Sequence, residues 1–94
     1  MNNLRFVWDE KKDRANQKKY KVSFEEADSV FFDENAFEYF DLEHSKEEDR
    51  FILLGFSFRL RALIVCYCCR EDDSTIRIFS ARKATKKESL NYRR

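Results

Sequence analysis

Two nearly continuous apolar segments, residues 50–58 and 62–69, follow each other closely in this chain. Runs of this length are typical of strands that are covered on both faces or nearly so. Between them, Arg59-Leu60 is too short for anything but a tight hairpin turn. The sequence therefore predicts an antiparallel hairpin in the interior of a sheet.

Three further strands are predicted from shorter patterns. Apolar and polar residues alternate over residues 4–8 and 75–82, and aromatic residues begin another strand near residues 36–41. The polar stretches at residues 44–49 and 71–74 indicate a loop and a turn.

Three helices are predicted from capping residues. A side-chain oxygen at the N-cap accepts the backbone N–H groups that the first helical turn leaves unpaired, and a glutamate three residues later completes a capping box. The caps are Asp9 for a helix over residues 10–20, Ser23 with Glu26 for residues 24–32, and Thr85 with Glu88 for a helix to the C-terminus.

The resulting order is β-α-α-β-β-β-β-α. Helices that pack on a mostly antiparallel sheet make an α+β fold. A chain of 94 residues is expected to form a single domain over residues 1–94.

Charge is distributed unevenly, although the net charge is only +1. Residues 1–24 carry seven basic and three acidic groups, residues 25–56 two and eleven, and residues 57–94 ten and four. A basic surface attracts phosphate chains whatever the total charge, so the basic C-terminal part is a candidate RNA-facing surface.

The cysteines predict neither a metal site nor a secreted protein. Cys66, Cys68 and Cys69 are odd in number and crowded into one strand, whereas a zinc site needs four converging ligands. We interpret them as small buried hydrophobic residues. The sequence has no long apolar stretch and no N-terminal signal core, so we expect a cytoplasmic protein without membrane contact.

A series of short motifs covers almost the whole chain. They are Phe6-Val7-Trp8-Asp9 with Lys12, Asn16 and Lys19; Val22-Ser23-Phe24-Glu25-Glu26-Ala27; His44-Ser45 with Glu48 and Arg50; Ile52-Leu53-Leu54-Gly55; and Ile76-Arg77-Ile78-Phe79-Ser80-Ala81-Arg82-Lys83-Ala84-Thr85 with Glu88 and Tyr92. Together they resemble the BrnT family of toxins, whose members adopt a RelE-like ribonuclease fold.

The chain departs from the family pattern at one place. Where the family usually has Lys-His-Gly, this chain has Lys19-Tyr20-Lys21. A glycine suits the left-handed residue that ends many helices, so Lys21 can replace it only with some strain or in a different turn. The change also leaves His44 as the only histidine.

The resemblance implies the toxin of a type II toxin–antitoxin pair. It implies a metal-independent endoribonuclease without a cofactor that cleaves RNA and inhibits translation and growth. It further implies neutralisation by a BrnA-type DNA-binding antitoxin, in a heterotetramer of two toxins and two antitoxins. Operator DNA would be bound only through the antitoxin.

Metal-free RNA cleavage needs a base for the attacking 2′-OH, cations for the charge that develops on the phosphate, and an acid for the leaving 5′-oxygen. Arginine suits the cationic role because its planar fork binds phosphate oxygens bidentately. Histidine titrates near neutral pH, which makes His44 the natural acid or base. The catalytic candidates are His44, Glu48, Arg61, Arg77 and Arg82, and the RNA-binding candidates are Lys12, Lys83, Tyr67 and Tyr92.

Strand alternation separates two of these arginines. Arg77 and Arg82 have opposite parity, so they share a face only if a bulge or the end of the strand intervenes. Each candidate also has a structural alternative, such as a solvated charge, an ion pair or a core aromatic residue.

Two rival functions remain open at this stage. One is a RelE-like scaffold that binds its antitoxin but is catalytically inactive, and the other is a small basic nucleic-acid-binding module. The helix at residues 10–20 and the final helix have thin apolar faces, and we expect the antitoxin to dock there and cover the basic surface.

Overall fold

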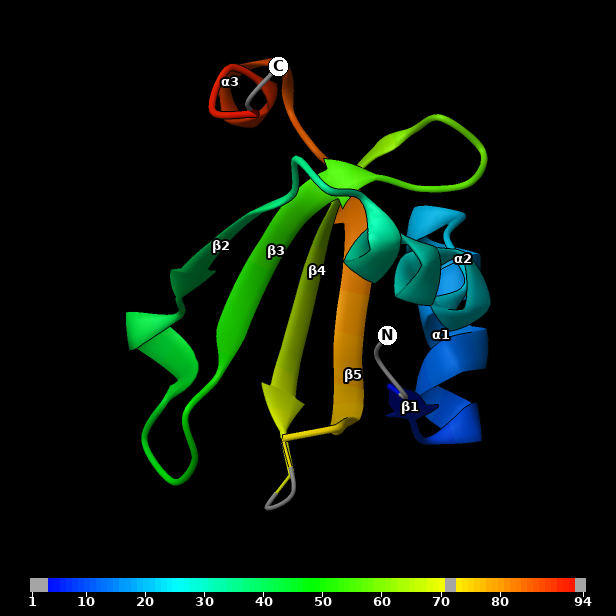
Figure 1. The fold of residues 1–94 in the computed structure, drawn as a ribbon. Helices are drawn as coiled ribbons and strands as arrows, with labels where there is room; N and C mark the ends of the chain where they lie inside the picture. Colours follow the sequence, from blue (N-terminus) through cyan, green and yellow to red (C-terminus); the bar gives the residue numbers. More distant parts are fainter. Residues whose placement is uncertain (1–3, 71–72, 93–94) are drawn as a thin grey trace.

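The computed structural model describes residues 4–70 and 73–92 of the chain. Five strands form one sheet in the order β1-β5-β4-β3-β2, with helices beside it (Figure 1). In chain order the elements are β1 (Arg5–Val7), α1 (Glu10–Tyr20), α2 (Phe24–Asp28), the 3-10 helix η1 (Ser29–Phe32), β2 (Phe37–Phe40), the 3-10 helix η2 (Leu42–His44), β3 (Phe51–Phe56), β4 (Ala62–Cys69), β5 (Thr75–Lys83) and α3 (Lys86–Ser89).

The predicted hairpin is confirmed as the antiparallel pair β3–β4, which lies inside the sheet. Its connection is longer than expected. The N–H of Ser57 donates to the carbonyl of Arg61 at 3.0 Å, so the loop takes in the residues between them, and Leu60 adopts a positive φ of 62°. β2 and β5 pair with the hairpin in antiparallel fashion, whereas β1 lies parallel to β5, so the sheet is mixed.

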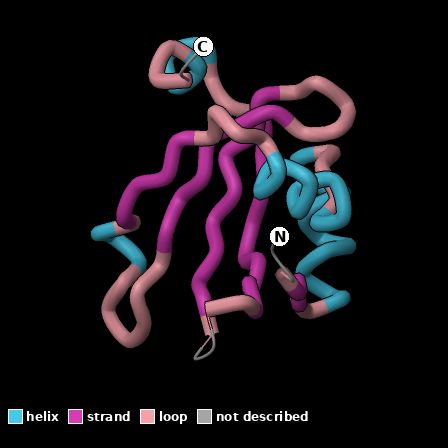
Figure 2. The backbone as a smooth tube through the Cα atoms, in the orientation of Figure 1, coloured by secondary structure: helices cyan, strands magenta, loops and turns pink. Residues whose placement is uncertain are grey.

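Helices α1, α2 and η1 lie on one side of the sheet, towards β5 and β1, whereas α3 lies beyond its upper end and η2 beside β2 (Figure 2). There α1 and α2 contact β5, and η1 contacts β3. The main core lies between these helices and the inward residues of the strands, which include Leu53, Val65 and Ile78. We call this side the helix face and the opposite side the outer face. No helix of the described residues is long and apolar enough to span a membrane.

Gly55 allows η1 to approach the sheet closely. A Cβ atom added there would lie 2.9 Å from Cγ1 of Val30 and 3.0 Å from Cβ of Ala36. These distances are shorter than ordinary contacts, so a side chain at this position requires η1 to move.

The helix caps follow the sequence closely, with one difference. Asp9 and Ser23 accept the expected N–H groups, and Thr85 forms a full capping box. Glu26, however, directs its carboxylate to Ser57 and Arg61 and not back to the N-cap.

The predicted helix over 24–32 changes to 3-10 geometry at Ser29. The helix expected from Thr85 to the C-terminus is wrong in length, because α3 ends at Ser89; its last residues, 93–94, lie outside the described residues. In the turn expected at 71–74, Glu71 and Asp72 also lie outside them.

Lys21 takes the left-handed conformation that the family glycine would have favoured. Its φ is 62° and its ψ is 32°, and its N–H donates to the carbonyl of Gln17 at 2.9 Å. The helix therefore ends as a glycine-capped helix does, but with a residue that bears a Cβ and is strained in this region.

Candidate active site

A β-bulge in β5 determines which side chains share the outer face. Ile78 pairs with Tyr67 and Ser80 pairs with Cys66, so Phe79 is an extra residue. Strict alternation would place Arg77 and Arg82 on opposite faces. The bulge shifts the alternation by one residue, so both lie on the same face, and they pair with Cys68 and Ile64 of β4.

Three cationic side chains gather around the ring of Phe79. The guanidinium carbon of Arg50 lies 3.9 Å from the ring centroid, and Lys12 Nζ and the guanidinium carbon of Arg77 each lie 5.8 Å from it. We call Lys12, Arg50 and Arg77 the cation cluster. They come from the first turn of α1, the residue before β3, and β5, so segments far apart in the sequence build it.

His44 lies at the rim of the cation cluster and is paired with a carboxylate. Its Nδ1 lies 2.9 Å from Oδ2 of Asp41. The side chain of Asp41 is 7% exposed and that of His44 is 60% exposed, so the carboxylate is buried and the imidazole is accessible to a ligand.

The backbone around Asp41 fixes this pair against the start of β3. The N–H of Asp41 donates to the carbonyl of Arg50 at 2.8 Å. The hydroxyl of Ser45 donates to the carbonyl of Asp41 at 2.6 Å and accepts the N–H of Arg50 at 2.9 Å. These bonds hold His44 and the Arg50 side chain in one small region.

A hollow of about 250 Å³ opens between these groups. It is lined by Lys12, Asp41, His44, Arg50, Cys66, Phe79 and Ser80. Within residues 4–70 and 73–92, the Nε of Arg50 is buried without a hydrogen-bond partner. Burial raises the pKa of the Cys66 thiol, so this cysteine is a neutral wall of the hollow.

A comparison with family models matches residues 8–88 to the ribonuclease toxin, BrnT, of type II toxin–antitoxin systems. This chain belongs to the BrnT family. Among solved structures it is similar to the ribonuclease toxin BrnT of Brucella abortus, with a TM-score of 0.67 and 19% sequence identity over 89% of this chain and 100% of that one. The search of curated proteins finds no match.

Of the BrnT residues singled out from the sequence, Lys12, His44, Glu48 and Arg77 lie in or beside the hollow. Glu48 does not contact His44; its carboxylate binds Arg50 Nη2 at 3.3 Å and lies 3.8 Å from Sγ of Cys68. Glu48 therefore orients a cation.

Arg61 and Arg82 lie elsewhere and are each paired with a carboxylate. Arg61 binds Glu26 through two nitrogens, with Nε 2.9 Å from Oε2, in the loop at the far end of the β3–β4 hairpin. Burial opposes ionisation of Glu26, but the bonds from Arg61 and Ser57 outweigh it and lower its pKa. The structure does not bring Arg61 to the cation cluster.

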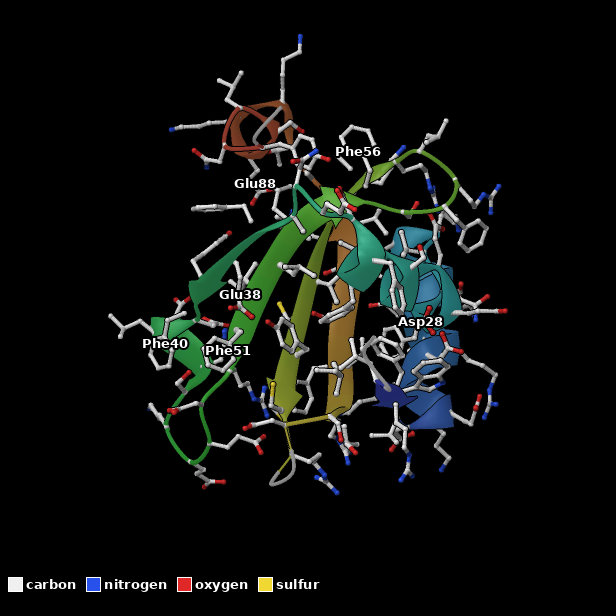
Figure 3. All side chains as sticks on the ribbon, viewed as in Figure 1. Asp28, Glu38, Phe40, Phe51, Phe56 and Glu88 are labelled. Atoms are coloured by element: carbon white, nitrogen blue, oxygen red, sulfur yellow. The ribbon has the colours of Figure 1, made fainter. Side chains whose placement is uncertain are left out.

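Arg82 shares the outer face with Arg77 but is held by α3. Both of its terminal nitrogens lie 2.8 Å from the oxygens of Glu88, on the short helix near the C-terminus (Figure 3). The hydrogen bonds from Arg82 lower the pKa of Glu88 to about 2. The pair ties α3 to β5 and leaves Arg82 with little charge to offer a ligand.

The remaining RNA-binding candidates also lie outside the hollow. Tyr67 is 2% exposed and packs on the helix face against Phe31 and Phe51. Tyr92 donates to Oδ2 of Asp33 at 2.7 Å. Lys83 is exposed at the end of β5.

Sequence reasoning missed three residues of this site. Asp41 stands three residues before His44, a spacing that a helical turn brings together. Arg50 stands in the segment with His44 and Glu48, where nothing in the sequence distinguishes it from the other charged residues. Phe79 had no signal of its own, because its position depends on the bulge.

Proposed function

We propose that this BrnT-family protein is a RelE-like, metal-independent endoribonuclease toxin that cuts RNA by attack of a 2′-OH on the adjacent phosphate. The observation that carries the proposal is the cation cluster beside the Asp41–His44 pair. Cations positioned where phosphate charge develops, next to a group that transfers protons, are the parts that this reaction requires.

The residues have distinct roles in the proposed reaction. Arg50, Arg77 and Lys12 hold the non-bridging oxygens of the scissile phosphate. When the Nδ1–H of His44 donates a hydrogen bond to Asp41, the Nε2 of the neutral ring can accept the proton of the attacking hydroxyl. The new bond joins the 2′-oxygen to phosphorus as the bond to the 5′-oxygen breaks. The 5′-oxygen takes a proton from water, and the products are a 2′,3′-cyclic phosphate and a 5′-hydroxyl.

Glu48 serves in this scheme by keeping Arg50 in place. We assign Arg61 and Arg82 to the stability of the fold, because each is neutralised by a glutamate. We also propose a BrnA-type antitoxin as partner, in a two-plus-two complex, with a segment over α1 and the exposed Leu90 after α3.

A cleavage assay in EDTA tests the proposal. The purified protein is expected to cut single-stranded RNA and to leave 2′,3′-cyclic phosphate ends, and its expression alone is expected to stop bacterial growth. Arg77→Ala and His44→Ala should each remove most of the activity. Arg59→Ala, which alters an exposed arginine of the β3–β4 loop, is the matched control and should cut normally.

Two results separate the rival functions. A folded protein that binds RNA but neither cuts it nor stops growth would be the inactive scaffold or a nucleic-acid-binding module. Of these, only the scaffold would bind the protein encoded by an adjacent antitoxin gene. Strict dependence of cleavage on a divalent ion would contradict the mechanism.

A further inference from the structure

Two aromatic side chains of β2 face the same side of the sheet as the cation cluster. Tyr39 pairs with Ile52, Ile52 with Cys66, and Cys66 with Ser80. These residues therefore form one row across the outer face. Phe37 stands two residues before Tyr39, and so it lies on that face as well.

Tyr39 is a diagonal neighbour of Arg50. The N–H of Asp41 donates to the carbonyl of Arg50, so these two residues lie opposite each other, and Tyr39 is two residues from Asp41 on the same face. Diagonal neighbours in an antiparallel pair are about 7–8 Å apart, which aromatic and long side chains can bridge. The Arg50 guanidinium contacts Phe79 of β5, so a phosphate held there would lie up to roughly 14 Å, or three strand spacings, from Tyr39 on β2 and within one or two nucleotides of its ring.

The aromatic pair is available to a ligand. The rings of Phe37 and Tyr39 have centroids 5.6 Å apart, and each residue is 38% exposed. Burial, followed by the charge of Glu88, raises the pKa of Tyr39, so the phenol is neutral and repels no phosphate. By contrast, Phe40 and Phe51 contact each other edge to face on the helix face (Figure 3).

We propose that Tyr39, backed by Phe37, stacks a base one or two nucleotides from the phosphate held by the cation cluster, and so selects single-stranded RNA. A base inside a duplex has both faces covered and cannot reach the ring, whereas an unpaired base can stack on an aromatic side chain. This inference rests on the proposed function, because it specifies which form of RNA the proposed ribonuclease binds.

Binding of a 2′-O-methyl RNA oligonucleotide in EDTA, followed by fluorescence anisotropy, tests the inference without cleavage. Because stacking on one aromatic ring is worth roughly 1–3 kcal/mol, Tyr39→Ala is expected to weaken binding about 10- to 100-fold, and Tyr39→Phe less than about 3-fold. Phe58→Ala, which alters an exposed aromatic residue of the β3–β4 loop, is the matched control and should bind as the wild type.

An abasic scan distinguishes stacking from a structural effect. The wild type should lose affinity when one particular base is removed, and Tyr39→Ala should not respond at that position. The slope of log affinity against log salt should stay unchanged in Tyr39→Ala and fall in Arg77→Ala, which removes a phosphate contact.

Three results would overturn the inference: wild-type affinity in Tyr39→Ala, equal losses for both proteins at every abasic position, or no binding of the oligonucleotide by the wild type. Cleavage of unmodified RNA, measured in parallel, reports on the proposed function separately. If the wild type cuts RNA while Tyr39→Ala binds normally, only the stacking role fails.

Discussion

Asn16 carries a larger share of the stability than its position on a polar helix suggests. Its Nδ2 donates to the carbonyls of Val22 at 2.8 Å and Ala81 at 2.7 Å, and its Oδ1 accepts the N–H of Ala81 at 3.2 Å. β1 pairs with β5 only over Thr75–Arg77, so beyond that point the amide of Asn16 takes the place of a neighbouring strand.

Asn16→Ala leaves three buried backbone groups without a partner, since Val22 and Ala81 are both fully buried. Each such group costs about 1–3 kcal/mol, so the lower limit for all three is a loss of about 3 kcal/mol. For a domain of this size that corresponds to a fall in Tm of roughly 12–24 °C.

Urea unfolding followed by circular dichroism and by the fluorescence of Trp8 measures this loss. Asn16→Asp sharpens the test, because its carboxylate faces two carbonyls when ionised and can donate to one of them when protonated. Relative to the wild type, this variant should lose less unfolding free energy at pH 4 than at pH 7. Gln17→Ala, on the exposed side of α1, should change stability by less than about 0.5 kcal/mol. A cost below about 1 kcal/mol for Asn16→Ala would refute the reasoning.

Three further substitutions test other features of the fold. Lys21→Gly should stabilise by about 1 kcal/mol in urea unfolding, because the left-handed conformation costs glycine nothing; equal gains from Lys21→Ala would contradict this. Asp28→Asn should raise the unfolding free energy above pH 6 and have little effect near pH 4. Burial, followed by the charge of Glu25, raises the pKa of Asp28 to about 6, so its folded form binds the proton more tightly and stability falls as pH rises from about 4 to 6; a flat wild-type profile in a pH series would count against it. Gly55→Ala should cost about 1–3 kcal/mol, measured as a lower Tm, and an unchanged Tm would show that η1 yields easily.

Local signals in the sequence predicted most elements of this fold. Caps such as Asp9 and Thr85 act within a few residues, so their pattern identifies where helices begin. The end of α3 was not predictable in this way, because neither glycine nor proline follows Ser89 to mark a stop.

The site was less predictable, because it depends on the register between strands. Tyr67 belongs to a strand that is apolar on both faces, and nothing in the sequence says which of its faces meets the helices. The pairing of Arg61 with Glu26 joins residues 35 apart and removes an arginine that the sequence alone would assign to the phosphate. His44 was identified by its residue type, whereas Asp41 needed the geometry of η2.

The extra residue in β5 makes the layout of the outer face depend on the bulge. The residues of β5 before Phe79 pair with β1 and contribute Arg77 to the cation cluster. The residues after Phe79 bind the amide of Asn16 and, through Arg82, contact α3. If Phe79 were instead paired in regular alternation, the two faces would be exchanged for the rest of the strand, and Arg82 would turn toward the core and Ala81 toward the hollow. The faces presented by the second half of β5 therefore depend on this one unpaired residue.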